Sequence, residues 1–225
     1  EKPPTTLDQL LEYARKITKP SEQIWGHYAL TAPNSQTGGD WFESMLWAYG
    51  ARVVSEDGKK VVFNSPEGVT ALQWYYDLVQ KHKGMPVKQV TETIMINDFL
   101  TGKIGSAFAF AAVVARAAKA KFRVGAVRRP AGPKGQTVPV GFGTIQVYAK
   151  GKNKEAGWEF AKFIGLNPEN AAFWNISFGQ LPARFSYRDT PSWQEYQKSV
   201  PLVEAYVEAQ KDAALSYYGP GVEEI

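Results

Sequence analysis

The sequence contains no cysteine and only two histidines in 225 residues. Without cysteine there can be no disulfides, thiolate metal sites or cysteine nucleophiles. The two histidines, His27 and His82, are too few for a cluster of imidazole metal ligands. We therefore expect no metal and no cofactor.

Long apolar runs and a strong net charge are also absent. No uncharged apolar run reaches the roughly 18 residues that a membrane-spanning helix needs. The 26 basic and 22 acidic residues give a formal net charge of +4, which is too small and too dispersed to indicate nucleic-acid binding. The densest basic runs are predicted to be solvated faces; they are 81–83, 119–123 and Arg128-Arg129.

Common catalytic motifs are missing. There is no Gly-x-Ser-x-Gly, no Walker loop and no dinucleotide fingerprint. Gly141-Phe142-Gly143 precedes an expected strand, whereas a phosphate-binding turn follows one. Several carboxylates could in principle form an acid/base pair, namely Asp40, Glu43, Asp57 and Asp98, but such residues usually lie on surfaces or at caps. The sequence therefore predicts a protein that is not an enzyme.

Aromatic residues are abundant, with seven Trp, eleven Tyr and twelve Phe, or 13% of the chain. They either fill a core or provide flat apolar surfaces for a ligand. We expect core positions for most tryptophans, namely Trp25, Trp74, Trp158, Trp174 and Trp193.

Helical and strand patterns interleave along the chain. Thr6 to Gln9 form a capping box, and Ser65-Pro66-Glu67 is a typical helix start, followed by an expected buried stripe of Val69, Leu72, Tyr76 and Val79. The expected helices are 7–17, 41–49, 65–81, 91–101, 111–121, 153–164, 167–177, a helix starting at 192, and 202–213. The expected strands are 25–30, 104–110, 122–127 and 144–149, with a hairpin over 52–63 and a loop over 31–40. This alternation predicts an α/β fold in which helices flank a sheet.

Six segments, in order, resemble the family of extracellular solute-binding proteins that includes the maltodextrin-binding proteins. They are 3–14, 63–72, 97–104, 125–130, 179–184 (Gly-Gln-Leu-Pro-Ala-Arg) and 217–221. Two positions depart from the family pattern: Leu7 replaces a tryptophan, and Ala111-Ala112-Val113-Val114 stands where a Gly-x-Trp platform is frequent.

The resemblance implies a class II periplasmic-binding-protein-like lobe with part of a second lobe. Residues 1–130 would form the main lobe, 131–188 part of the other lobe, and 189–225 helices that return to the main lobe. The chain would be truncated at both ends relative to such proteins. The resemblance also implies a periplasmic or extracellular location, with a sugar or polyol and an ABC transporter permease as partners. Contact with a membrane would occur only through the transporter, and no nucleic acid would bind.

The resemblance also implies the ligand-binding positions. They are Gly39, Asp40, Trp41, Gly141, Phe142, Gly143, Arg184, Tyr217 and Tyr218. Trp41 would stack on a sugar ring and Asp40 would accept hydroxyl hydrogen bonds, although Trp41 could equally begin a buried helix. Trp47, on a different helical face, is assigned to the core.

The leading hypothesis is non-catalytic binding of a carbohydrate or similar polyol for uptake. A glycerol-phosphate-type ligand is an alternative that Arg184 and the net charge favour. An excised or engineered lobe without binding of its own is a second alternative, and a carbohydrate-active enzyme is a third.

Overall fold

The computed structural model describes residues 2–33, 35–141 and 143–216, and the chain divides into two compact units. Unit 1 comprises Glu1–Ala109, Val127–Gly141 and Ala209–Ile225; unit 2 comprises Phe110–Ala126 and Phe142–Glu208. These bounds differ from the expected division, since residues 110–126 and 189–208 belong to unit 2. The assignment of segments to the lobes of a two-lobed protein stays a prediction.

The expected α/β fold is confirmed. The helices are α1 (Leu7–Ile17), α2 (Gln36–Tyr49), α3 (Pro66–Tyr76), α4 (Glu92–Leu100), α5 (Val114–Ala117), α6 (Lys154–Leu166), α7 (Pro168–Ser177), α8 (Pro191–Ser199) and α9 (Glu204–Ala209). The strands are β1 (Trp25–Tyr28), β2 (Ile104–Ala107), β3 (Val138–Val140) and β4 (Ala213–Leu215). Among the described helices, none combines the length and apolar character that crossing a bilayer requires.

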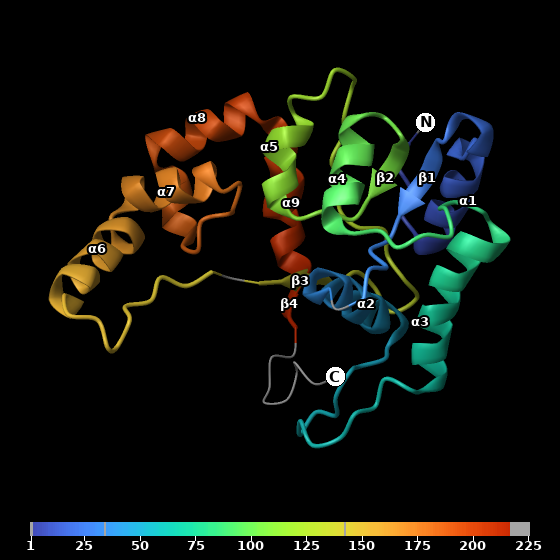
Figure 1. The fold of residues 1–225 in the computed structure, drawn as a ribbon, viewed down its shortest axis with the longest axis horizontal. Coiled ribbons are helices and arrows are strands. Elements are labelled where there is room, and N and C mark those ends of the chain that lie inside the picture. The colour runs from blue at the N-terminus through green and yellow to red at the C-terminus, as the bar shows by residue number, and fades with distance from the viewer. Residues whose placement is uncertain (1, 34, 142, 217–225) are drawn as a thin grey trace. The chain divides into compact units, whose positions relative to one another are not determined.

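Unit 1 is organised around the parallel pair β1–β2, in which Trp25 pairs with Ile104 and His27 with Ser106. Helix α1 packs on β1 and α4 on β2 (Figure 1). The approach of α1 requires a glycine in β1, because a Cβ at Gly26 would lie 2.1 Å from the carbonyl oxygen of Ala14. The glycine at this position therefore determines how closely helix and strand approach each other.

Helix α3 buries a different face from the one expected. Val69, Leu72 and Tyr76 are more than half exposed, whereas Ala71 and Trp74 are buried. Trp74 decides this orientation, because its indole is larger than any residue of the expected stripe and donates a hydrogen bond of 3.2 Å to the carbonyl of Leu7. The helix continues beyond Tyr76 as a π-helical turn, Asp77–Lys81, so the expected end near residue 81 is confirmed.

The core of unit 1 contains an aromatic cluster centred on Phe108, just after β2. Its ring centroid lies 4.7 Å from that of His27, 5.6 Å from that of Trp41 and 6.5 Å from that of Trp74. His27 is 1% exposed, and its Nδ1 lies 2.9 Å from Ser106 Oγ, its partner in the strand register. Burial, with a smaller contribution from the positive charge of Arg129, lowers the pKa of His27 to about 3, so the imidazole is neutral at physiological pH.

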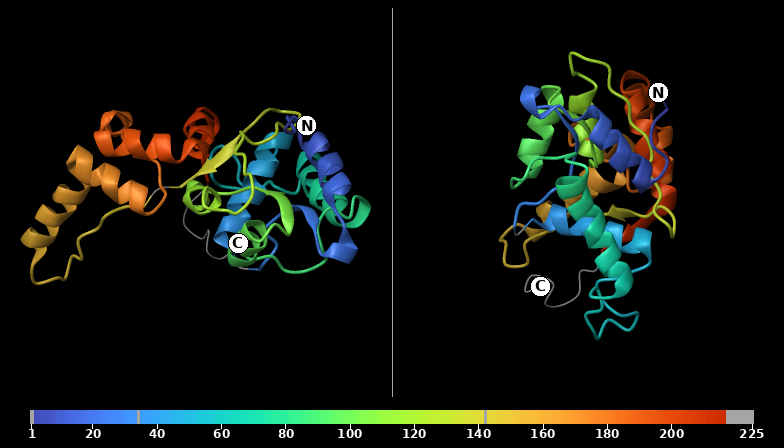
Figure 2. Two further views of the ribbon diagram at one scale, coloured as in Figure 1. Left: turned by 90° about the horizontal axis from the view of Figure 1, so that it is seen from above. Right: turned by 90° about the vertical axis from the view of Figure 1, so that its right-hand side faces the viewer.

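Unit 2 has its own core. Helix α7 packs on both α6 and α8 (Figure 2). The buried cluster joins Val114 of α5 to α7 and α8; its other members are Ala172, Trp193, Tyr196 and Val203. Of the tryptophans expected in the core, Trp74 and Trp193 are 3% and 0% exposed, but Trp158 is 55% and Trp174 43% exposed. The core assignment of Trp158 and Trp174 is therefore wrong.

Three expected strand features are not formed. Residues 122–127 and 144–149 are irregular, and the expected hairpin over 52–63 is reduced to one bridge, between Val54 and Val61. A β-branched pattern needs a neighbouring strand to satisfy its backbone, and among the described residues no strand pairs with 122–127 or 144–149. The β-propensity of a segment does not show whether a partner strand lies beside it.

The buried neutral His27 predicts acid-sensitive stability. Between its unfolded pKa of 6.5 and its folded pKa of about 3, the unfolded chain binds a proton that the folded chain does not. The free energy of unfolding should therefore fall as pH drops through this window, by at most about 1.4 kcal/mol per pH unit. Urea unfolding at pH 7, 6 and 5 measures this slope.

A single substitution tests the role of His27. His27→Gln should flatten the pH dependence between pH 7 and 5. Equal slopes for the wild type and a folded His27→Gln variant would contradict a neutral, buried His27.

Candidate functional site

Helix α2 contributes two of the side chains that line a pocket in unit 1, Glu43 and Trp47. The expected loop over 31–40 is wrong at its end, because the helix begins at Gln36, where the side chain of Ser35 accepts a hydrogen bond from the amide of Gly38 at 3.0 Å. The helix ends at Gly50, whose φ of 90° is left-handed, as expected for a C-terminal glycine. Most of its second half is buried, including Glu43 at 8% exposed, and Glu43 and the half-buried Trp47 also line the pocket.

The buried face of α2 includes Trp41, Met45 and Ala48, at helical spacing. Trp41 is 8% exposed and packs against Phe108. The Oγ of Ser44, fully buried, donates to the carbonyl of Trp41 at 2.6 Å. Trp41 is thus buried in a helix, as one of its two expected possibilities had it, but the helix begins five residues earlier, at Gln36. Its role in ligand binding stays a prediction.

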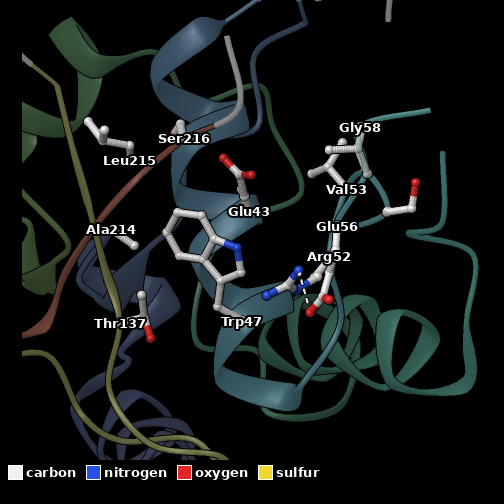
Figure 3. A pocket seen from close by; sticks show the side chains of 12 residues that line it. Glu43, Trp47, Arg52, Val53, Glu56, Gly58, Thr137, Ala214, Leu215 and Ser216 are labelled. Carbon is white, nitrogen blue, oxygen red and sulfur yellow. Dashed lines mark ion pairs between the residues drawn. The ribbon is translucent and has the colours of Figure 1, made fainter. Parts of the chain in front are cut away.

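The other face of α2 forms one wall of a pocket of about 500 Å³. Glu43 and Trp47, four residues apart and so one turn above each other, project into it (Figure 3). The core assignment of Trp47 is wrong in this respect: its indole is half-buried and lines the pocket. The spacing of Glu43 and Trp47, four residues apart, is the feature of the sequence from which this wall could have been predicted.

Two further walls complete the pocket. Thr137 and the segment Ala214 to Ser216 lie on one side, and the loop from Arg52 to Gly58 on the other (Figure 3). The first wall exists because β3 and β4 pair in parallel, with Val138 opposite Ala213 and Val140 opposite Leu215. Sequence reasoning missed Thr137 and Ser216, because no local pattern shows that β3 and β4 are neighbours.

The pocket combines charged and neutral polar groups. Arg52 forms an ion pair of 3.1 Å with Glu56, and both side chains are largely exposed, at 55% and 86%. The Ser216 hydroxyl is 7% exposed and has no hydrogen-bond partner among the described residues. An indole face, a carboxylate and a buried hydroxyl are together suited to a ligand with apolar C–H faces and several hydroxyl groups.

The other expected site residues are placed as follows. Gly39 and Asp40 lie in the early turns of α2, with Gly39 exposed; Gly141 is exposed directly after β3. Gly143 and Arg184 belong to unit 2, where Arg184 is exposed and its guanidinium lies 5.7 Å from the ring centre of Tyr187. Phe142, Tyr217 and Tyr218 lie outside the described residues. Binding by each of these positions stays a prediction.

Within the part of the chain that the structure describes, no three His, Asp or Glu side chains cluster as a metal site would require.

The contrast between the two tryptophans of α2 is testable. Trp41→Ala should lower the free energy of unfolding by roughly 3 kcal/mol or more, because it leaves a cavity beside Phe108. Trp47→Ala should lower it by only about 1 kcal/mol. Urea unfolding followed by circular dichroism measures both, and equal losses would contradict the division of α2 into a core face and a pocket face.

Comparison with known proteins places this geometry in context. Over its full length, the chain is similar to the structure of maltose-bound T. maritima MalE3, with 26% identity and a TM-score of 0.80, covering 57% of that chain. It covers 56% of the ABC substrate-binding protein Lmo0181 from Listeria monocytogenes in complex with cycloalternan, with 98% of this chain aligned, 21% identity and a TM-score of 0.77. It also covers 56% of UgpB from Mycobacterium tuberculosis in complex with glycerophosphocholine, with 99% of this chain aligned, 20% identity and a TM-score of 0.77.

The chain thus spans a little over half the length of these structures. The family model for the bacterial extracellular solute-binding protein matches residues 1–171, which is most of the chain. This match agrees with the resemblance found in the sequence motifs and with the α/β fold of the structural relatives. The chain belongs to the bacterial extracellular solute-binding protein family.

Proposed function

We propose that the chain binds a neutral carbohydrate or similar polyol without chemical change, and that the pocket beside α2 contributes to the binding site. The observation that carries the proposal is the placement of Trp47 and Glu43 one turn apart on the same wall. A pyranose ring presents a flat face of C–H groups that stacks on an indole. Its hydroxyl groups donate hydrogen bonds that a carboxylate accepts.

The described ligands of the structural relatives support this substrate class. MalE3 holds maltose and Lmo0181 holds cycloalternan, and both are sugars. We further propose that the bound sugar is delivered to an ABC transporter permease and that binding takes place outside the cytoplasm, because Lmo0181 is an ABC substrate-binding protein and the matching family is extracellular.

A phosphodiester ligand is the second candidate, because UgpB, with the same fold, holds glycerophosphocholine. The pocket itself favours a neutral ligand. Glu43 and Glu56 bring negative charge to its lining, and Arg52 is already paired with Glu56. A net anion such as glycerol phosphate would be repelled by the two carboxylates more than it would be attracted by the one paired cation, whereas the quaternary ammonium of glycerophosphocholine balances its phosphate charge.

The pocket does not suit hydrolysis. A glycosidase needs two carboxylates facing the same bond, one of them a general acid in a sheltered environment. Glu56 is 86% exposed and ion-paired with Arg52, which is the opposite of that environment. We therefore propose that the sugar leaves the protein unchanged.

Isothermal titration against maltose, maltotriose, a cyclic glucose oligomer and glycerol phosphate tests the proposal. We expect measurable affinity for at least one sugar and weaker or no binding of glycerol phosphate. Trp47→Ala should weaken sugar binding about tenfold, which corresponds to the loss of one aromatic stacking contact, and Glu43→Gln should weaken it as well.

Trp158→Ala provides the matched control, since Trp158 is an exposed tryptophan of unit 2. This variant should bind as the wild type does. Equal affinities for the wild type and Trp47→Ala would exclude the pocket, and chromatographic detection of shortened sugar after incubation would exclude a purely binding role.

A further inference from the structure

The dipeptide Arg128-Arg129 is buried in part, against the expectation of a solvated basic run. Arg129 is 7% exposed, and its guanidinium lies 4.6 Å from the centre of the Phe108 ring. Its carbonyl accepts a hydrogen bond from Gln136 Nε2. Neither arginine lines the pocket, so their connection to it is indirect.

Arg129 contacts α2 on the side of the helix that faces away from the pocket. Its Nη1 donates to Ser44 Oγ, and its Nη2 lies 2.6 Å from the sulfur of Met45. Ser44 in turn donates to the carbonyl of Trp41. Ser44 and Met45 directly follow Glu43 on α2 and lie within the turn that separates Glu43 from Trp47. The guanidinium therefore fixes the turn of helix that carries both pocket side chains.

The same guanidinium also holds the opposite wall. Nη1 of Arg129 donates to the carbonyl of Thr137 at 3.2 Å, and Thr137 lines the pocket. One planar cation thus spans α2 and the start of β3. Because the donors of a guanidinium lie in a rigid plane, the separation of the two walls depends on this side chain.

Arg128 fixes the strand beside β3. Its Nε and Nη2 both donate to Asp212 Oδ2, the former at 3.1 Å, and Asp212 directly precedes β4. Ala214 and Leu215 of β4 line the pocket. This connection does not involve Arg129, so it should persist when Arg129 is replaced, and unit 1 should stay folded.

A buried cation is costly for stability unless it is well compensated. Among the described residues, no carboxylate pairs with Arg129; its partners are a hydroxyl, a carbonyl, a sulfur and an aromatic face. Burial lowers the pKa of Arg129 to about 10, so the side chain remains charged at neutral pH. Arg129 lies outside the pocket and bonds to both the α2 wall and the Thr137 wall. We infer that the cost of burying it is offset by the fixed spacing that it gives these two walls.

We propose that Arg129 is a positioning residue that sets the spacing between the α2 wall and the Thr137 wall of the pocket. The effect of Arg129 on sugar binding rests on the proposed function. The effect of Arg129 on the position of Trp47 does not depend on that function, and the two effects can be measured separately.

Fluorine NMR of protein labelled with 5-fluorotryptophan measures the placement directly, with the Trp47 resonance assigned through a Trp47→Phe variant. Arg129→Met keeps an unbranched side chain under Phe108 and removes the donors to Ser44 and Thr137. We expect the Trp47 resonance to shift or broaden in Arg129→Met, and less so in Arg129→Lys, which keeps a cation. Arg15→Met, at an exposed arginine of α1, should leave that resonance unchanged.

Titration of the same variants with maltotriose gives the effect on binding. Arg129→Met should weaken it about tenfold or more, since the walls lose two hydrogen bonds to a charged group. Arg129→Lys should restore part of the affinity, and Arg15→Met should bind as the wild type does. A role confined to stability would lower the melting temperature but leave the Trp47 resonance in place.

The outcomes separate the two claims. An unmoved Trp47 resonance in a folded Arg129→Met variant would overturn the positioning role. A moved resonance in a protein that binds no sugar would support positioning and overturn the proposed function. If Arg129→Met does not fold, Ser44→Ala decides. It removes the hydroxyl that accepts from Arg129 and donates to the Trp41 carbonyl, and it leaves the contact with Met45 in place. A shifted Trp47 resonance supports the role, and an unchanged one overturns it.

Discussion

The ring of Phe108 is the contact on which the structure of unit 1 depends. It touches His27 from β1, Trp41 from α2, Trp74 from α3 and Arg129 from the segment before β3. These segments are far apart in the sequence, and the parallel pairing of β1 with β2 brings Phe108 to their meeting point. A polar imidazole and a guanidinium can be buried here because each finds hydrogen-bond partners and an aromatic neighbour. The same cluster orients α2, so the core decides which face of that helix remains open.

The candidate site follows from that orientation. With Trp41 and Met45 turned toward Phe108 and Arg129, Glu43 and Trp47 are left on the face that meets β4 and the loop after α2. The pocket is thus a consequence of how α2 packs, and its chemistry suits a neutral sugar better than an anionic phosphate ester. The family and the structural relatives agree with a binding role. The chain covers a little over half of those relatives, so delivery to a transporter remains part of the proposal.

Local chemistry was enough to predict much of the fold. The caps at Thr6 and Ser65 correctly marked helix starts, because each side chain accepts a hydrogen bond from a backbone amide three residues on. It was less clear which of two apolar helix faces would be buried. In α3 the face of Trp74 is buried instead of the regularly spaced Val69, Leu72 and Tyr76, because the indole is large and donates a hydrogen bond. Long-range partners were not predictable: the buried state of Arg129 depends on Ser44 and Thr137, and the pocket depends on the pairing of β3 with β4. The prediction that Arg128-Arg129 is solvated rested on charge alone and was wrong for Arg129.

The central claim is that the α2 pocket binds sugar through Trp47 and Glu43. A crystal structure of the chain soaked with maltotriose tests it most directly. The account predicts a glucose ring stacked on the indole of Trp47, with at least one hydroxyl within hydrogen-bond distance of the Glu43 carboxylate. Sugar bound elsewhere on the chain, with this pocket empty at a saturating sugar concentration, would contradict it.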